Sequence, residues 1–222
     1  TWNIAPALIE RAILDRIAKG RKPSAIVFVD LYGMPAKIAE ISAIAARYEI
    51  PLIEDAAEAL SATYKGKQTG SFGKFNAVSF NGNKIITTSG GGMFLSDDEE
   101  AVSRVRFFST QAREQAPHYQ HEHIGYNYRM SNVVAGIGRG QLFHLEEHRK
   151  LKEEIYMRYK EGLRGLPVSM NPYEECTVPN FWLSCMLIDE EAMDKVTPEK
   201  IRLALEKENI EARPIWKPMH MQ

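Results

Sequence analysis

The sequence predicts an α/β fold with a mostly parallel sheet. Two short and nearly continuous apolar runs, Ser24–Asp30 (SAIVFVD) and Pro51–Ala56 (PLIEDA), are typical of strands that are covered on both faces. A stretch with helical character lies between them, and the connections on both sides are tight. A strand, a helix and a further strand in this order are typical of a parallel sheet with helical crossovers.

Two helices accompany these strands. Apolar residues recur at helical spacing within Pro6–Lys19, with a proline in the first turn and Gly20 after the last turn. We expect a second helix to begin at Pro35, shortly after Gly33, and to end near Tyr48. Together with the two strands, these helices complete the expected crossover pattern.

The middle of the chain is richer in turns. Ser61–Gly73 contains several glycines and lysines, and Lys65 and Gly66 are expected at a hairpin tip. Asn76–Phe80 is typical of a further strand. Gly91–Asp97 (GGMFLSD) predicts another strand that runs antiparallel to it after a tight reversal.

A long polar loop is expected between two helical stretches. Asp97 or Asp98 can cap a helix that runs to about residue 109. Residues 111–130 then show little periodicity and many polar aromatic side chains. Loops of that length inside a compact domain are usually functional. Ser131 caps the second helical stretch, which extends to about residue 165.

The chain changes character near residue 166, where prolines become frequent. We therefore expect residues 1–165 to form most of a large domain, including a long connecting helix, and residues 166–222 to form part of a smaller one. Within the second part, Phe181–Ile188 (FWLSCMLI) predicts a strand. Thr197–Lys207 predicts a helix with threonine as its cap and proline in its first turn.

The composition excludes several classes of protein. The chain has 222 residues, of which 44% are hydrophobic, enough for one large domain or two small ones. Its formal net charge of -1, from 28 basic and 29 acidic residues, gives no electrostatic case for nucleic acid or an anionic membrane as a partner. No apolar run approaches a membrane span, and the charged N-terminal stretch is unlike a signal peptide. Cys176 and Cys185 match no zinc spacing and favour two reduced thiols, so we expect a soluble, cytoplasmic protein.

Asp55 and Lys84 are the leading candidates for chemistry. Asp55 ends a predicted parallel strand, where open α/β sheets place ligand-binding groups, and Lys84 follows the end of another strand. A lysine that forms a Schiff base and an aspartate that pairs with a pyridinium nitrogen are the protein groups of pyridoxal phosphate chemistry. On position alone, a helix cap and a solvated loop lysine are the simpler explanation, because both residue types are common at strand ends.

The setting of Lys84 is nevertheless unusual. In Ser79–Met93 (SFNGNKIITTSGGGM) it is followed by Ile85 and Ile86, a frame that suits a lysine partly removed from water to act as a nucleophile. Ser79 lies near the end of the same strand, where its hydroxyl could donate to a phosphate or simply face a packed helix. The glycines that follow are expected to let the backbone turn and approach its neighbours closely.

Three other motifs are weaker. Gly136–Gly140 (GIGRG) has no strand before it and lies in a helical stretch, so its glycines are expected to permit close packing rather than to bind phosphate. His118, His121 and His123 lack convincing partner carboxylates, and we expect no metal site. Gly125–Met130 (GYNYRM) offers donors for phosphates, carboxylates and sugar hydroxyls, or forms an ordered aromatic loop that anchors the next helix.

Three stretches together resemble a known family. Ile53–Leu60, Tyr64–Met93 and His118–Leu142, in this order and spacing, resemble the DegT/StrS family of pyridoxal-phosphate-dependent nucleotide-sugar aminotransferases. The likeness runs over the whole chain and is greatest to members that aminate nucleotide-linked 4-keto-6-deoxy sugars for polysaccharides or glycans. It implies an aspartate-aminotransferase-like fold (fold type I), with part of a small α+β C-terminal domain after the large one.

The resemblance also implies roles for residues of the large domain. Lys84 would form the internal aldimine with pyridoxal 5'-phosphate, and Asp55 would pair with the pyridine nitrogen of the cofactor. Ser79 would contact its phosphate. Glu58 stands where many relatives have glutamine, near the ring hydroxyl of the cofactor or near the substrate.

Further implied roles concern the substrates and a second subunit. Asn127 resembles the asparagine that crosses a homodimer interface to the neighbouring subunit's phosphate site. Arg129 resembles the arginine that receives the carboxylate of the amino donor, and His220 lies in a stretch similar to one near the sugar site. The implied reaction has two steps: glutamate leaves its amino group on the cofactor and departs as 2-oxoglutarate, and a nucleotide-linked keto sugar then receives the group. Lys84 would move the proton.

The departures from the family lie at the two ends of the chain. Relatives carry a segment before the position of Thr1 that helps to bind the phosphate and the ring, and they continue beyond Gln222. We therefore expect a chain truncated at both ends, with weak or absent cofactor binding in isolation. A non-catalytic relative that dimerises or binds a ligand without turnover is the alternative. Lys84 argues against a dehydratase branch in which histidine replaces the lysine, and the identity of the sugar stays open.

Overall fold

A computed structural model describes residues 1–218 and residue 221. The chain forms two compact units: Thr1–Glu154 with Pro172–Leu183, and Ile155–Asn171 with Ser184–Gln222. Pro172–Leu183 lies after the boundary predicted near residue 166 and belongs to the first unit. The division into a large and a small domain at that boundary stays a prediction. Within the described residues, no helix combines the length and the apolar character that a membrane span requires.

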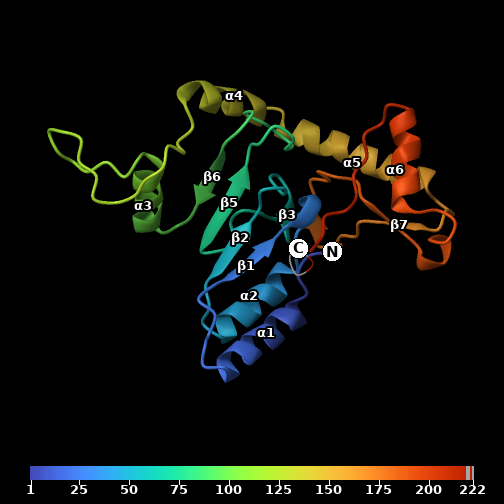
Figure 1. Ribbon diagram of the computed structural model, residues 1–222, viewed down its shortest axis with the longest axis horizontal. Coiled ribbons are helices and arrows are strands. Elements are labelled where there is room, and N and C mark those ends of the chain that lie inside the picture. The colour runs from blue at the N-terminus through green and yellow to red at the C-terminus, as the bar shows by residue number, and fades with distance from the viewer. Residues whose placement is uncertain (219–220, 222) are drawn as a thin grey trace. The chain divides into compact units, whose positions relative to one another are not determined.

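The first unit is built on a four-stranded sheet with the strand order β1-β2-β5-β6 (Figure 1). The first three strands are parallel to one another, and β6 pairs antiparallel with β5. The predicted mostly parallel sheet and the predicted reversal before its last strand are therefore confirmed. The strands are β1 (Ile26–Val29), β2 (Leu52–Asp55), β5 (Phe75–Ser79) and β6 (Gly92–Leu95).

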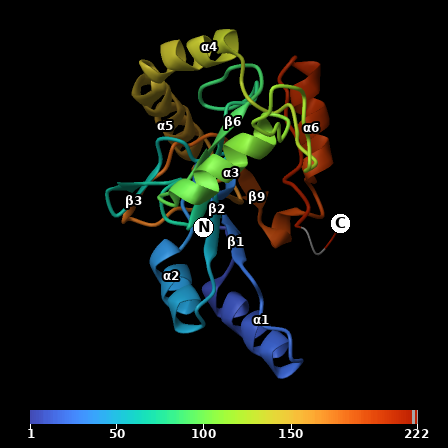
Figure 2. The same ribbon diagram turned by 90° about the vertical axis from the view of Figure 1, so that its left-hand side faces the viewer.

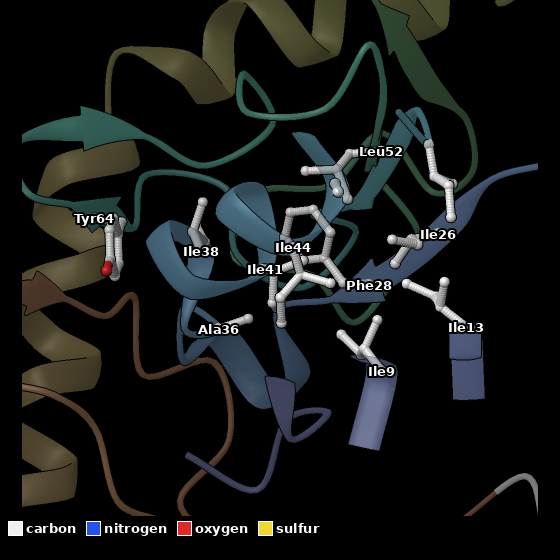
Figure 3. Packing of buried hydrophobic residues seen from close by; sticks show 12 residues of the cluster. Ile9, Ile13, Ile26, Phe28, Ala36, Ile38, Ile41, Ile44, Leu52 and Tyr64 are labelled. Carbon is white, nitrogen blue, oxygen red and sulfur yellow. The ribbon is translucent and has the colours of Figure 1, made fainter. Parts of the chain in front are cut away.

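Two helices, α1 (Pro6–Ala18) and α2 (Ile38–Arg47), lie side by side next to β1 and β2, as Figure 1 and Figure 2 show. The second helix begins three residues later than the sequence predicts. Both helices point isoleucines at the strands, and these side chains form the main hydrophobic core (Figure 3). Its labelled members are Ile9, Ile13, Ile26, Phe28, Ala36, Ile38, Ile41, Ile44, Leu52 and Tyr64.

A small second sheet joins distant parts of the first unit. Strands β3 (Thr63–Tyr64) and β4 (Lys67–Gln68) form a hairpin, and β8 (Thr177–Val178) pairs with β3 from the other side. Lys65 and Gly66 occupy the hairpin tip with φ angles of 49° and 78°, so the predicted tip is confirmed. The pairing of β8 explains why a segment late in the sequence belongs to the first unit.

Both helical stretches begin where the sequence predicts, and the first also ends at the predicted residue. Helix α3 (Glu99–Ser109) is capped by Asp98, and α4 (Asn132–Leu142) is capped by Ser131. The predicted helical stretch to about residue 165 is present as two helices, because a turn at residues 143 and 144 interrupts the helical hydrogen bonds between α4 and α5 (Leu145–Gly162). Two side chains flank this break and bind the loop after Lys84: Gln141 accepts from the backbone N–H of Thr87 (3.3 Å), and His148 Nδ1 lies 3.0 Å from the carbonyl of Ile85.

The second unit contains the antiparallel pair β7 (Val168–Met170) and β9 (Met186–Ile188) and the helix α6 (Pro198–Lys207). Thr197 caps α6, as predicted. The predicted strand Phe181–Ile188 is correct only for its last three residues. Its first residue has a φ angle of 53°, outside the range of a strand. Two single-turn helices, η1 (Leu31–Gly33) and η2 (Glu190–Ala192), complete the elements.

Two acidic residues, Asp30 and Glu54, are fully buried near the carboxyl ends of β1 and β2. Asp30 follows β1, and its Oδ1 accepts a hydrogen bond from the backbone N–H of Ala36 (2.8 Å). Its Oδ2 has no hydrogen-bond partner among the described residues. Glu54 in β2 accepts from the backbone N–H groups of Gly70 and Phe72, both at 2.7 Å. Burial raises the pKa of Asp30 well above its usual range, and the neighbouring Glu54 raises it further, so folding favours a protonated Asp30.

The raised pKa of Asp30 predicts that the free energy of unfolding decreases as the pH rises. Between the ordinary aspartate pKa and the raised pKa, the folded protein holds a proton that the unfolded chain has lost, so the free energy of unfolding falls by up to about 1.4 kcal/mol per pH unit. Asp30→Asn removes this slope and keeps an acceptor for Ala36. We expect a higher melting temperature than wild type at alkaline pH and a flatter profile in thermal melts between acid and alkaline pH. Asp15→Asn on the exposed face of α1 is the matched control, and parallel profiles for wild type and Asp30→Asn would contradict the prediction.

Candidate active site

The candidate site lies at the carboxyl ends of two neighbouring parallel strands. Asp55 is the last residue of β2, and Ser79 is the last residue of β5. In the ladder, Asp55 pairs with Ala77, so Ser79 stands two residues further along the adjacent strand. Open α/β sheets bind ligands at this edge, because loops after the strands leave it accessible.

The loop between β5 and β6 carries Lys84 and is fixed on both sides of it. The backbone N–H of Lys84 donates to the carbonyl of Asn81 (3.0 Å), and that of Thr88 donates to Phe80 (2.9 Å). Ile85 and Ile86 are buried, and Ile86 belongs to a second hydrophobic cluster beside the sheet. The two isoleucines after the lysine therefore hold the loop against the core and leave the amine at the edge of the sheet.

The amine of Lys84 is largely removed from water. The lysine side chain is 12% exposed, and its Nζ lies 3.9 Å from Oε1 of Glu58 and 4.2 Å from the ring centroid of Trp182. Burial lowers the pKa of Lys84, while the charges of Glu58 and Asp55 oppose that shift. A lowered pKa leaves more of the amine uncharged at neutral pH, which is the form that attacks a carbonyl carbon.

Glu58 is the carboxylate nearest to this amine. Its Oε2 accepts a hydrogen bond from the backbone N–H of Tyr32 (2.6 Å), which lies in η1 with a φ angle of 58°. Burial raises the pKa of Glu58, whereas the Tyr32 N–H and the charge of Lys84 lower it. One carboxylate oxygen is thus held by the loop after β1, and the other faces the amine.

Asp55 contributes a second negative charge to the same site. Its Oδ1 accepts from the backbone N–H of Ala57 (3.0 Å), which fixes the carboxylate just beyond the strand. Its charge raises the pKa of both Lys84 and Glu58, so the three groups lie within electrostatic reach of one another. Asp55 and Lys84, the two leading candidates from the sequence, are thus close enough to interact electrostatically, and the roles assigned to them stay predictions.

Two residues of the site were missed by the sequence interpretation. Asn180 is fully buried: its Nδ2 donates to the carbonyls of Glu58 (2.7 Å) and Leu60 (2.9 Å), and its Oδ1 accepts from the backbone N–H of Trp182 (2.9 Å). The indole Nε1–H of Trp182 donates to the carbonyl of Asn83 (2.7 Å). No local sequence pattern indicates these contacts, because both residues lie about a hundred residues beyond Lys84, and Trp182 was assigned to the predicted strand Phe181–Ile188.

Of the remaining predicted site residues, the structure describes Ser79, Asn127 and Arg129. The Oγ of Ser79 accepts from the backbone N–H of Asn81 (3.3 Å). Asn127 and Arg129 are exposed residues of the chain between α3 and α4, where Asn127 pairs with Thr110 in an isolated bridge. Within residues 1–218 and 221, neither of the two forms a hydrogen bond or an ion pair with Lys84. His220 lies outside the described residues. The roles assigned to these residues stay predictions.

The histidine and glycine motifs serve the structure locally. His121 Nδ1 lies 3.0 Å from the carbonyl of Gln111, and His123 Nδ1 lies 3.2 Å from Glu114, so both fasten the long loop. Across the described part of the chain, no cluster of three or more histidine, cysteine or acidic side chains is arranged to hold a metal ion. Gly136–Gly140 lies within α4 as predicted. Close packing is confirmed only at Gly138, where a Cβ atom would lie 2.9 Å from Cγ2 of Thr88, because a Cβ atom at Gly136 or Gly140 would meet nothing within 4 Å.

The chemistry of this donor set fits pyridoxal phosphate. Two carboxylates and one amine come together at the edge of the sheet. Such a site suits a ligand with an electrophilic carbon for Lys84 and a protonated ring nitrogen for Asp55. The hydroxyl of Ser79, at the adjacent strand end, can donate to a phosphate.

Comparison with known proteins decides the family. The sequence profile of the DegT/DnrJ/EryC1/StrS aminotransferase family matches residues 1–222. This chain belongs to that family. The resemblance noted in the sequence is thereby confirmed.

Individual members of the DegT/DnrJ/EryC1/StrS family match over the whole chain. EpsN of Bacillus subtilis (strain 168), which is named as a pyridoxal phosphate-dependent aminotransferase, is 48% identical over 223 residues, 100% of this chain and 56% of EpsN. A GDP-perosamine synthase of Caulobacter vibrioides is 34% identical over 223 residues, 100% of this chain and 58% of the synthase. The crystal structure of a family aminotransferase from Brucella abortus has a TM-score of 0.87 at 27% identity, covering 100% of this chain and 58% of its own. The predicted aspartate-aminotransferase-like α/β fold is confirmed, and the chain spans between 56% and 58% of the length of these relatives.

The contacts of Asn180 predict a large loss of stability on truncation. Asn180→Ala leaves the buried carbonyls of Glu58 and Leu60 without their donor and opens a small cavity. We expect a loss of about 2–5 kcal/mol in the free energy of unfolding, measured by urea titration. Asn132→Ala at the exposed start of α4 is the control and should change stability by less than about 0.5 kcal/mol. Equal effects of the two substitutions would show that the hydrogen bonds of Asn180 carry no special weight.

Proposed function

We propose that this chain is part of a pyridoxal-phosphate-dependent aminotransferase that transfers an amino group from glutamate to a nucleotide-linked keto-deoxy sugar. The observation that carries the proposal is the buried Lys84 amine beside Glu58 and Asp55, at the ligand-binding edge of the sheet in a chain of this family. The name of one relative, GDP-perosamine synthase, supports a nucleotide-linked sugar as the acceptor. A role in polysaccharide or glycan synthesis follows from such a product.

Three residues would hold the cofactor. Lys84 would bind its aldehyde carbon, Asp55 would pair with its ring N–H, and Ser79 would donate to its phosphate. When bound, pyridoxal phosphate supplies an electron sink that makes the proton on the amino-bearing carbon of the substrate acidic. The carboxylate of Asp55 keeps the ring nitrogen protonated, which preserves that property.

Lys84 would then act as the proton carrier. Once its Nζ no longer bonds to another group, the uncharged amine would accept a proton at nitrogen from the amino-bearing carbon of the substrate and deliver it to the C4′ carbon of the bound cofactor, as the family resemblance implies. Glu58 stabilises the ammonium form that results, because its Oε1 faces Nζ. Trp182 and the buried isoleucines exclude water from one side of the amine.

The proposed partners follow the family resemblance. Arg129 would receive the carboxylate of glutamate, and His220 would lie near the sugar. Asn127 stands on the exposed loop beyond α3, a position that suits contact with a second subunit of a homodimer. We place the protein in the cytoplasm, where nucleotide-linked sugars are made and consumed.

The proposal predicts capture of the cofactor at one lysine. The 222-residue chain, and the longest natural protein that contains it, are titrated with pyridoxal 5'-phosphate, reduced with borohydride and digested for peptide mass spectrometry. We expect an imine absorbance band and a modified Lys84, at least in the longer protein. Lys84→Ala should lower the modified fraction by about tenfold or more, whereas Lys65→Ala at the exposed hairpin tip should leave it unchanged.

Turnover is tested in the same preparation. Glutamate and a panel of nucleotide-linked keto sugars should give 2-oxoglutarate and an amino sugar in equal amounts. Modification of Lys84 without any amino sugar supports the non-catalytic alternative. Modification spread over exposed lysines, with none at Lys84, overturns the proposal.

A further inference from the structure

We infer that Trp182 is a positioning residue for Lys84: its indole face holds the free amine opposite Glu58, and Asn180 fixes the indole in place. The inference rests on the proposed function in taking Lys84 as the reactive amine. Nothing in the sequence pattern links the two residues, and the contact arises only because Pro172–Leu183 folds back into the first unit.

The geometry is that of a cation–π contact removed from solvent. Nζ of Lys84 lies 4.2 Å from the ring centroid, and Trp182 is only 3% exposed. Indole is the strongest of the aromatic partners for a cation, and the attraction grows where water is excluded. The other lysine–aromatic contacts in the described residues involve exposed lysines at longer distances: Lys65 over Tyr64 at 5.5 Å, Lys67 over Phe72 at 4.7 Å and Lys74 over Phe75 at 5.3 Å.

The indole is fixed relative to the amine. Its Nε1–H donates to the carbonyl of Asn83, the residue directly before Lys84, so the ring is tied to the turn that carries the amine. Its backbone N–H donates to Asn180, whose amide also donates to the carbonyl of Glu58. One buried side chain therefore fixes the two groups between which the amine lies.

The backbone conformation of Phe181, between Asn180 and Trp182, indicates that tertiary contacts fix the position of the indole. Phe181 is buried and has a φ angle of 53°, a left-handed conformation that costs a bulky residue of order 1–3 kcal/mol. The hydrogen bonds of Asn180 on one side and of Trp182 on the other maintain it. This left-handed turn directs the Trp182 ring towards Lys84, whereas an extended backbone at Phe181 would direct it away.

A consequence follows for the protonation of the amine. Burial favours the uncharged form, whereas the Glu58 carboxylate and the indole face both favour the ammonium. Removing the indole's electrostatic contribution while keeping its volume therefore lowers the pKa of Lys84. The expected change is about half to one pKa unit, which corresponds to roughly three- to tenfold more uncharged amine at a given pH below the midpoint.

The test replaces Trp182 in the cofactor-free chain and follows each lysine separately. Site-specific Trp182→tetrafluorotryptophan keeps the shape and the N–H donor but weakens the negative face of the ring. Trp182→Leu removes the ring. The rate of acylation of Lys84 by a trace of acetic anhydride is measured against pH, and each lysine is read by peptide mass spectrometry.

The fluorinated variant should move the midpoint for Lys84 to lower pH and leave the midpoint for Lys67 unchanged. Trp182→Leu also admits water to the amine, which opposes that shift, so the fluorinated variant decides. Phe72→Leu, the matched control, removes the ring beside the exposed Lys67 and should leave the Lys84 profile unchanged. An unchanged or raised Lys84 midpoint in the fluorinated protein overturns the inference, and so does an equal shift at all lysines.

This outcome is separable from the proposed function. A chain that never captures pyridoxal phosphate at Lys84 contradicts the proposed function, and its acylation profile still reports whether Trp182 holds the amine. Conversely, normal capture with an unchanged midpoint in the fluorinated protein keeps the proposed function and removes the role of Trp182.

Discussion

The hydrogen bonds of one buried amide hold the candidate site together. The side-chain amide of Asn180 binds the carbonyls of Glu58 and Leu60 in the turn after β2 and the backbone N–H of Trp182 in its own segment. The backbone N–H of Asn180 donates to the carbonyl of Gly33 in the loop after β1. Position 33 in the loop after β1 requires glycine for two reasons. Its φ angle is 84°, and a Cβ atom there would lie 1.8 Å from Oδ1 of Asn180. Because each polar group of this amide is used in a dry environment, none of the three segments can shift without leaving a buried group unpaired.

The three segments are also the ones that surround the reactive amine. The loop after β1 gives the Tyr32 N–H that holds Glu58, the turn after β2 gives Glu58 itself, and the third segment gives Trp182. Lys84 comes from a fourth segment, in which Ile85 is buried and Ile86 packs in the second hydrophobic cluster. The properties of the amine are therefore set by tertiary contacts among loops, while the parallel sheet supplies only the common edge at which the loops meet.

This division explains what the sequence could and could not predict. Strands, caps and the hairpin tip depend on local residue types, and the strand-end positions of Asp55 and Lys84 followed from the same local signals. The strand predicted at Phe181–Ile188 was wrong at its start, because an apolar run carries no sign of the left-handed turn that tertiary hydrogen bonds impose. Asn180 and Trp182 were missed for the same reason, since their partners lie in segments far away in the sequence.

The acid at position 58 matters because of its orientation. One oxygen of Glu58 accepts a hydrogen bond from the backbone N–H of Tyr32, and the other faces the amine of Lys84. The oxygen of a glutamine side chain could also accept the hydrogen bond from Tyr32. With glutamine, the group facing the amine would be an N–H donor, which repels an ammonium and leaves the uncharged amine as the favoured form. Glutamate instead attracts the ammonium, and burial raises its own pKa towards that of the amine, which burial lowers. The charge of Lys84 in the free site therefore depends on two opposing effects, desolvation of the amine and its attraction to Glu58. A group that accepts and returns a proton works best with a pKa near neutral pH, and these opposing effects can bring the pKa of Lys84 towards that value.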